Sequence, residues 1–388
     1  MSNIQIQDKT YIANTYARFP VTIVRGQGAT DFDENGKKYI DLGSGIAVNS
    51  FGVNDSVWKE AVISQLNQVQ HTSNLYYTLP QVKLAKLLCE KTGMCRVFFS
   101  NSGAESNECA IKVARKYGSD HYGEGIRPKI ITLLNSFHGR TITTLSATGQ
   151  DVFHHSFGPF TPGFTFVPAN DYNAMEKAAD GNDVCGIMLE LVQGEGGVLT
   201  LEEDYVQKVA ALCKEKDILL LIDEVQTGNG RTGTLYAYQQ FGIQPDVVST
   251  AKGLAGGLPM GATLLGEKVK DTLDAGSHGS TFGGNPICAA AALSIIERLD
   301  DTFLAEVRKK HDVIVKTLSH LKHVQDISGM GLMLGITCDR PALEVVNDCI
   351  ANGVIPLTAK NKVRFLPALN ISWEELDEAL NILVKILG

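Results

Sequence analysis

Lys252 is a candidate for covalent chemistry. It follows an expected strand, residues 246–250, and precedes Gly253, which gives no side-chain cover, so the lysine amine is free to project into a crevice. A lysine in such a place can form a Schiff base with a carbonyl compound. Most lysines that follow a strand are solvated end residues, so Lys252 alone does not establish a site.

Asp223 is a candidate partner for a cationic or protonated ring. It ends the apolar run 219–222, which is typical of a strand buried on both faces, and Glu224 follows it directly. Ligands of open α/β sheets bind at the carboxyl ends of strands, and two adjacent carboxylates there are costly unless a cation or a proton meets one of them. A solvated strand end with an acidic turn is the alternative interpretation.

The stretch Phe98–Glu105 predicts a strand followed by a helix whose start can hold an anion. Ser102 and Glu105 have the spacing of a capping box, and the helix that follows carries an apolar face. A helix start offers free backbone N–H groups and the positive end of the helix dipole, and Gly103 permits close approach. A capped helix that binds nothing is the alternative.

Two further stretches add aromatic, basic and hydroxyl groups. In Phe137-His138-Gly139-Arg140-Thr141, the phenyl ring suits the face of a planar ligand, and the guanidinium suits a carboxylate. A core phenylalanine and a surface arginine are the simpler interpretation. In Gly279–Pro286, Ser280 and Thr281 stand among glycines, which fits a second phosphate clamp or a linker between domains.

Together these stretches supply an anion cradle, an acid for a ring nitrogen, an amine, an aromatic face and a carboxylate-binding arginine. Pyridoxal 5'-phosphate needs this set, because its chemistry uses a lysine and a protonated pyridine ring. The sequence therefore predicts a pyridoxal phosphate site.

The elements that position these residues alternate between strands and helices from about residue 55 to residue 285. Residues 202–216 carry apolar residues at helical spacing, so we expect a helix that packs on the sheet. This alternation predicts an α/β fold with a mostly parallel sheet covered by helices. The expected strands are 96–99, 129–134, 184–190, 218–222, 246–250 and 260–265.

The two ends of the chain predict a second, smaller α+β domain. Helices are expected near 286–299, 302–318 and 373–387, and short strands near 323–337 and 362–366. The first fifty residues have hairpin character and too little core to fold alone, so we expect them to pack with the C-terminal unit. The expected division is an N-terminal segment 1–54, a large cofactor-binding domain 55–285 and a small domain 286–388.

Composition excludes several classes of function. The chain has 35 Lys and Arg against 43 Asp and Glu, a net charge of −8, which disfavours nucleic acid and anionic membranes as partners. The eight cysteines form no C-x-x-C pair and indicate buried apolar residues in a reducing compartment, and the nine histidines have no metal-binding spacing. The polar segment 1–9 lacks a secretory signal, so we expect a cytoplasmic protein without a metal site.

Four stretches make the chain similar to a known family. It resembles the class III, ornithine-type aminotransferases, which are pyridoxal phosphate enzymes of fold type I, over almost its whole length. The most specific stretches are Phe99–Glu105, Ser136–Thr141, Ile222–Gly228 and Ser280–Pro286. The resemblance is strongest to the branch that transfers the ω-amino group of N2-acetylornithine to 2-oxoglutarate in arginine biosynthesis.

The resemblance implies a role for each matching residue. Lys252 would bind the cofactor covalently and then move a proton, while Asp223 would keep the ring nitrogen protonated. Active sites of this family are shared across a homodimer, so Thr281 would reach the phosphate of the neighbouring subunit. The other implied cofactor-binding residues are Gly103, Ala104, Phe137, Glu224, Val225 and Gln226, and the implied substrate-binding residues are Arg140, Ser280, Glu195 and Arg364.

Several related activities remain open at this stage. Ornithine, succinylornithine and 4-aminobutyrate aminotransferases share the same motifs, because the acyl group on the donor is selected by pocket shape. An aminomutase would use the same cofactor residues, and a non-catalytic protein that only holds pyridoxal phosphate is a further alternative. A requirement for 2-oxoglutarate would exclude the aminomutase.

Overall fold

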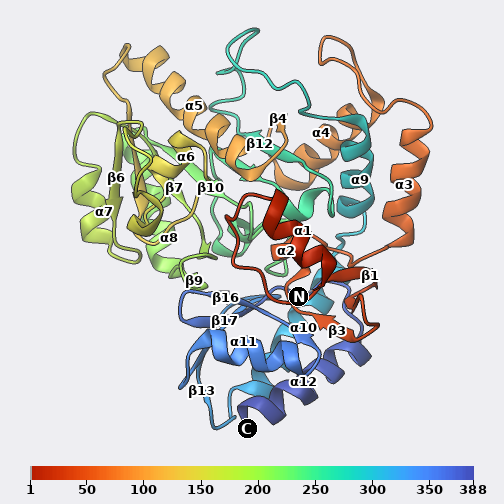
Figure 1. The fold of residues 1–388 in the computed structure, drawn as a ribbon. Helices are drawn as coiled ribbons and strands as arrows, with labels where there is room; N and C mark the ends of the chain where they lie inside the picture. Colours follow the sequence, from red (N-terminus) through yellow and green to blue (C-terminus); the bar gives the residue numbers. More distant parts are fainter. Residues whose placement is uncertain (1) are drawn as a thin grey trace.

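A seven-stranded sheet forms the centre of the molecule. The computed structural model describes residues 2–388, and Figure 1 shows this sheet with helices on both faces in the upper part of the view. The order is β4-β12-β11-β10-β7-β5-β6, in which β12 runs antiparallel to both neighbours and the strands from β11 to β6 are parallel. The strands are β4 (Arg96–Ser100), β5 (Lys129–Leu133), β6 (Phe164–Val167), β7 (Val184–Leu189), β10 (Leu219–Asp223), β11 (Val247–Thr250) and β12 (Gly261–Leu265).

Side chains of β10 alternate between two apolar cores. Leu219 and Leu221 pack with the residues of α5 (Gly103–Tyr122), whereas Leu220 and Ile222 pack with those of α8 (Glu203–Lys216) on the other face. All five residues of β10 are buried, as expected of a strand covered on both faces. The predicted α/β class, with its mostly parallel sheet, is confirmed.

The six predicted strands are all present in this sheet, with no bound shifted by more than one residue. The predicted helix 202–216 is also present, and its stripe of Val206, Val209 and Cys213 is buried. One strand of the sheet, β6, was not expected from the sequence. It lies at the edge of the sheet and its four residues alternate less clearly between faces.

The C-terminal part forms the smaller unit in blue at the bottom of Figure 1. Its antiparallel sheet has the order β13-β14-β17-β16, with β13 (Val324–Met330), β14 (Met333–Cys338), β16 (Leu357–Ala359) and β17 (Lys362–Phe365). Helices α10 (Asp301–Leu318) and α12 (Trp373–Leu387) match the sequence analysis, whereas α11 (Ala342–Ala351) was not expected.

The N-terminal strands pack with this C-terminal unit. β1 (Ile23–Gln27), β2 (Thr30–Asp33) and β3 (Lys38–Asp41) form a meander, and β3 pairs in parallel with β15 (Val354–Ile355). α9 (Pro286–Ile296) packs instead against α3 (Ser56–Leu66) and α4 (Leu79–Thr92). The domain limits at residues 54 and 285 stay a prediction.

The remaining elements are short or lie at the surface. Among residues 2–388, every helix is too short or too polar to cross a membrane. The eight cysteines are all free, but only four are buried, so the other four depart from the buried interior expected of them. The other elements are α1 (Asn3–Tyr11), α2 (Ser44–Ala47), α6 (Ile142–Ala147), α7 (Tyr172–Ala178), β8 (Val192–Gln193), β9 (Leu199–Thr200) and three 3₁₀ turns, η1 (Asp151–Phe153), η2 (Ala237–Phe241) and η3 (Lys252–Leu254).

Candidate active site

A cavity of about 410 Å³ lies at the carboxyl ends of the central parallel strands. Glu190 follows β7, Asp223 ends β10 and Lys252 follows β11, and all three line this cavity. The sheet order places β7, β10 and β11 side by side, so these three side chains meet at one edge. Of the residues that the sequence assigned to a cofactor or substrate, the cavity is also lined by Gly103, Ala104, Phe137, Arg140, Val225 and Gln226.

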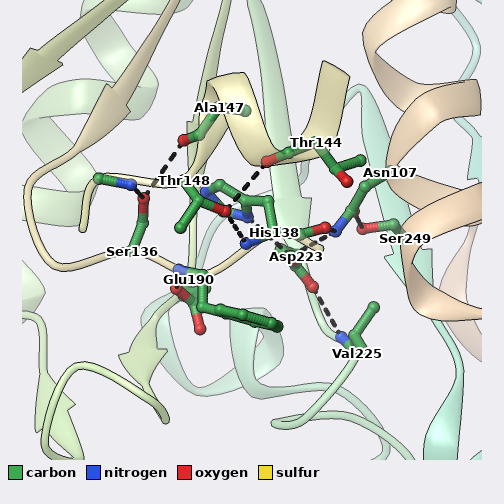
Figure 2. Close-up of polar contacts among 12 residues, drawn as sticks. Asn107, Ser136, His138, Thr144, Ala147, Thr148, Glu190, Asp223, Val225 and Ser249 are labelled. Carbon is green, nitrogen blue, oxygen red and sulfur yellow. Dashed lines mark hydrogen bonds and ion pairs between the residues drawn. The ribbon is translucent and has the colours of Figure 1, made fainter. Parts of the chain in front are cut away.

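Asp223 is held by three hydrogen bonds, as Figure 2 shows. Its Oδ2 accepts from Asn107 Nδ2 at 2.7 Å and lies 2.8 Å from His138 Nδ1, while its Oδ1 accepts from the backbone N–H of Val225 at 3.0 Å. Ser249 Oγ in turn donates to Asn107 Oδ1. These contacts fix the orientation of a buried carboxylate that has no arginine or lysine partner in the described residues.

His138 and Glu190 share the buried space around Asp223. Burial alone would lower the pKa of His138, but the hydrogen bond and charge of Asp223, with Glu190 beyond, raise it above its ordinary value. Burial raises the pKa of Glu190, with Asp223 adding to the effect and His138 opposing it. Glu190 also accepts from the N–H of Phe137 at 2.7 Å, which fixes the aromatic residue at the cavity wall.

Lys252 is held in an uncommon backbone conformation. Its φ of +46° lies in the left-handed region, which is strained for a residue with a side chain and is often found at functional sites. Asn229 Nδ2 donates to Ala251 O at 3.0 Å on one side of Lys252, and Ser50 Oγ donates to Gly253 O at 3.1 Å on the other. Burial lowers the pKa of the Lys252 amine, with Arg364 adding to the effect and Glu195 opposing it.

The N-terminus of α5 opens onto the same cavity. Ser102 caps this helix by accepting from Glu105 N at 3.2 Å, as predicted. The second hydrogen bond of the predicted capping box, from Ser102 N to the Glu105 carboxylate, was wrong. The carboxylate instead accepts from Asn101 N at 2.6 Å, one residue before the cap. A Cβ at Gly103 would lie 2.6 Å from Val225 Cγ1, so only glycine lets the valine pack against the helix start.

Glu224 does not face the cavity, contrary to the expected cofactor contact. It is fully buried on the other side of the strand end, where Oε1 accepts from Tyr238 N at 2.8 Å and Oε2 accepts from Thr227 Oγ1. Successive residues of a strand point to opposite faces, so Asp223 and Glu224 cannot both enter one site. Burial raises the pKa of Glu224 to about 7.

Arg364 and Glu195 form an ion pair beside the cavity. Arg364 Nη1 donates to Glu195 Oε1 at 2.6 Å and to Gln226 Oε1 at 3.2 Å, so the pair reaches the cavity through the glutamine. The Arg364 side chain is 3% exposed and that of Glu195 is 28% exposed. Burial would raise the pKa of Glu195, but the guanidinium of Arg364 lowers it, and the glutamate stays ionised.

Arg140, in contrast, has no ion pair in the described residues. It is exposed at the cavity wall, where its guanidinium lies 4.1 Å from the ring centroid of Phe153 and 5.5 Å from that of Phe137. An unpaired arginine stacked on aromatic rings is free to receive a carboxylate.

Ser280 and Thr281 lie outside the cavity. Ser280 Oγ accepts from Asn101 Nδ2 at 3.1 Å, and Asn101 is a lining residue, so the hydroxyl stands next to the helix start. Thr281 is exposed in this single chain.

Three residues around Asp223 were not assigned a role from the sequence. Glu190 ends a predicted strand and could have been found by the rule that selected Asp223. His138 stands inside a stretch chosen for its phenylalanine and arginine. Asn107 gives no local signal, because it lies within α5 and reaches Asp223 only when the helix packs on the sheet.

The cavity fits pyridoxal phosphate. The start of α5 suits the phosphate, because Gly103 there leaves no room for a side chain. The buried Asp223 carboxylate is held rigidly and has no arginine or lysine partner in the described residues, which suits a protonated ring nitrogen. The amine of Lys252 has a lowered pKa and no hydrogen-bond partner in the described residues, as a nucleophile requires. Gly103, Ala104, Phe137, Asp223, Val225, Gln226 and Lys252 would hold the cofactor.

Comparison with known proteins agrees with this geometry. The acetylornithine aminotransferase of Haemophilus ducreyi is 54% identical over all of both chains, and that of Caldanaerobacter subterraneus subsp. tengcongensis is 45% identical over 98% of both. The ornithine aminotransferase of Toxoplasma gondii, with partially occupied pyridoxal phosphate at its active site, superposes with a TM-score of 0.94 at 31% identity, covering 99% of this chain and 93% of that one. The N-acetylornithine aminotransferase of Stenotrophomonas maltophilia superposes with a TM-score of 0.85 at 34% identity, covering 98% and 97%. The class-III aminotransferase family model matches residues 11–387, and the chain belongs to this family.

Proposed function

We propose that this pyridoxal phosphate-dependent aminotransferase moves the ω-amino group of N2-acetylornithine to 2-oxoglutarate, giving N-acetylglutamate 5-semialdehyde and glutamate. The observation that carries the proposal is the ion pair of Arg364 and Glu195 beside the cavity, because it suits an enzyme with two unlike substrates. The names of the relatives at 54% and 45% identity support the acetylated donor. The proposed place is a cytoplasmic step of arginine biosynthesis.

The chain positions groups for proton transfer. Bound pyridoxal phosphate supplies an electron sink when its ring nitrogen is protonated. Asp223 would face that nitrogen and keep the proton on it, while His138 and Asn107 hold the carboxylate in place. The amine of Lys252, whose pKa is lowered by burial, would take a proton from the amine-bearing carbon of the substrate and return it to the carbon on the other side of the amine nitrogen.

Two arginines receive the substrate carboxylates. Arg140 is exposed and unpaired, so it can bind the α-carboxylate of the acetylated donor. Arg364 is neutralised by Glu195 while that donor is bound, since the reacting carbon of an ω-amine carries no carboxylate. When glutamate or 2-oxoglutarate enters, the half-exposed Glu195 moves away and Arg364 binds the carboxylate next to the reacting carbon.

A donor panel tests this function. N2-acetylornithine, N2-succinylornithine, ornithine and 4-aminobutyrate are each supplied with 2-oxoglutarate, and glutamate formation is measured. The proposal expects the highest kcat/KM with N2-acetylornithine. Turnover without 2-oxoglutarate would indicate an aminomutase, and a cofactor absorbance band that no donor shifts would indicate a binding protein. A clear preference for another donor would reassign the substrate.

We also propose that the enzyme is a homodimer with shared active sites. An apolar surface precedes α4, where the side chains of Leu75, Tyr76 and Tyr77 are 88%, 68% and 99% exposed, and Phe282 beside Thr281 is 60% exposed. Such exposure is costly in water and favours burial against a second copy. Sedimentation should give twice the chain mass, and Thr281→Ala should weaken cofactor binding.

Active-site sharing is tested with mixed dimers. One subunit carries Lys252→Ala and the other Thr281→Ala, so that one of the two sites in each mixed dimer receives both lesions and the other receives neither. Sharing predicts that one site per mixed dimer recovers wild-type cofactor affinity. If Thr281 acts within its own subunit, each site carries one of the two lesions, and neither site recovers wild-type cofactor affinity.

A further inference from the structure

Arg231 is a buried cation that does not line the cavity. It lies in the loop after β10, its side chain is among the largest that are fully buried, and it is 2% exposed. Its Nη1 donates to two backbone carbonyls of the C-terminal unit, Leu332 O at 2.9 Å and Pro367 O at 2.5 Å. Burying a guanidinium is costly, so a fold that keeps one there gains something that an apolar side chain would not provide.

The backbone around Arg231 fits the C-terminal unit closely. Leu332 N donates to Arg231 O at 2.9 Å, which adds a hydrogen bond in the opposite direction. Gly331 has a φ of +54°, and a Cβ there would lie 2.5 Å from Arg231 O. The turn between β13 and β14 therefore docks directly on the loop that carries Arg231.

Two links join the same pair of segments. Gln226 and Arg231 belong to the loop after β10, whereas Arg364 and Pro367 belong to β17 and the residues that follow it. The inner link is Arg364 to Gln226 at 3.2 Å, and the outer link is Arg231 to Pro367. The outer link holds the segment that follows β17 against the loop, in addition to the pairing of β17 with β14 and β16, and it lies three residues from Arg364.

We propose that Arg231 is a positioning residue that holds Arg364 ready to bind the carboxylate next to the reacting carbon. This inference rests on the proposed function, in which Arg364 binds glutamate or 2-oxoglutarate after Glu195 has moved away. While Glu195 is in place, it makes the shortest contact with Arg364, at 2.6 Å. Once it leaves, the guanidinium keeps neutral contacts with Gln226 Oε1 at 3.2 Å and Gly194 O at 3.3 Å, and the Arg231 link helps to keep them aligned.

The charges around Arg231 indicate that its guanidinium stays ionised and keeps both carbonyl contacts. Asp41 is the nearby anion, and it uses one carboxylate oxygen to accept from Gly43 N and Ser44 N. Burial lowers the pKa of Arg231 to about 9, with Asp41 opposing the effect, so the guanidinium stays charged at pH 7. Its Nη2 has no hydrogen-bond partner in the described residues, so the two carbonyls on Nη1 carry the contact.

The test separates the two half-reactions in Arg231→Met. Glutarate, a dicarboxylate that cannot react, is titrated into the holoenzyme, and its Kd should rise at least about tenfold, as the loss of a well-placed charged hydrogen bond predicts. Single-turnover rates should fall about tenfold with glutamate and less than about threefold with N2-acetylornithine. The absorbance of the bound cofactor should match that of the wild type.

Two further variants serve as control and as substitute. Arg308 on α10 donates to Gly233 O in the same loop but, within residues 2–388, makes no hydrogen bond to segment 364–367, so Arg308→Met should leave glutarate affinity unchanged. Arg231→Lys keeps the charge, but its side chain is shorter than that of arginine, so its ammonium does not reach the position from which Nη1 donates to both carbonyls, and it should weaken glutarate at least threefold. That variant decides the question if Arg231→Met does not fold.

Equal losses in both half-reactions, unchanged glutarate affinity in Arg231→Lys, or an equal effect of Arg308→Met would overturn the inference and leave the proposed function standing. A wild-type enzyme that neither binds glutarate nor reacts with glutamate would overturn the proposed function itself.

Discussion

Replacing Glu195 by glutamine removes the charge that neutralises Arg364 and keeps the shape of the side chain. We expect the half-reaction with N2-acetylornithine to fall while the half-reaction with glutamate is retained or improves. The free guanidinium would capture the α-carboxylate of the donor, which then binds with the wrong end at the reacting position. Glutamate would no longer have to displace a competing carboxylate.

The size of this effect follows from the contacts. Arg364 makes one short bond to Glu195, at 2.6 Å, and one long one, at 3.4 Å, and it keeps Gln226 as a neutral partner at 3.2 Å. A hydrogen bond to a charged group contributes about 1.5–3 kcal/mol, which corresponds to roughly 10- to 150-fold in a rate ratio. Because two neutral partners remain, Gln226 Oε1 and Gly194 O, we expect the lower end, about a tenfold shift in selectivity.

Stopped-flow single turnovers measure the two half-reactions separately through the absorbance of the bound cofactor. Glu195→Asp keeps the charge on a shorter side chain and should shift the ratio less than Glu195→Gln. Since Arg364 lowers the pKa of Glu195, this carboxylate should keep its charge from about pH 6 to pH 9, so the difference between the wild type and Glu195→Gln should not disappear within that range. Equal losses in both half-reactions would refute the reasoning and assign Glu195 a structural role.

Two neighbouring carboxylates give contrasting predictions. Asp223→Asn should lower kcat about a hundredfold or more with the fold intact, because an amide cannot keep the ring nitrogen protonated; a near-normal kcat would contradict the role. Glu224→Gln should leave kcat nearly unchanged, because this side chain faces Thr227 and Tyr238 rather than the cavity, and a large loss would show that Glu224 acts in the reaction. The pKa of Glu224 is raised to about 7 in the folded chain, so this carboxyl group makes folding less favourable as the pH rises from about 4.5 to about 7. Glu224→Gln removes that cost. It should increase the free energy of unfolding at pH 8, on the order of 1–3 kcal/mol, and change it little at pH 4.5. Urea denaturation at both pH values measures this, and equal effects at the two would contradict the sign.

The parts of the fold that sequence analysis predicted are those with a local pattern. The continuous apolar run of β10 and the helical spacing on α8 depend only on neighbouring residues, and both elements are present. The edge strand β6 and the helix α11 were missed, because their patterns were not singled out in the sequence. Asp223 and Lys252 were selected as candidates for the same reason, because Asp223 ends a buried strand and Lys252 follows one.

Residues that depend on tertiary packing were not predictable in this way. Asn107 reaches Asp223 from the middle of a helix, and Arg231 finds its carbonyl partners about 100 and 136 residues further along the chain. Glu224 was wrongly placed in the cofactor site because sequence proximity to Asp223 says nothing about which face of the strand end it occupies.

Chemical trapping of the cofactor tests the central claim most directly. Borohydride converts the link between pyridoxal phosphate and the lysine that holds it into a stable secondary amine, and peptide mapping then identifies that lysine. The account predicts one pyridoxyl group per chain, on the peptide that contains Lys252, and none in Lys252→Ala, which should still bind the cofactor without a covalent bond. A label on any other lysine would contradict the assignment of the site.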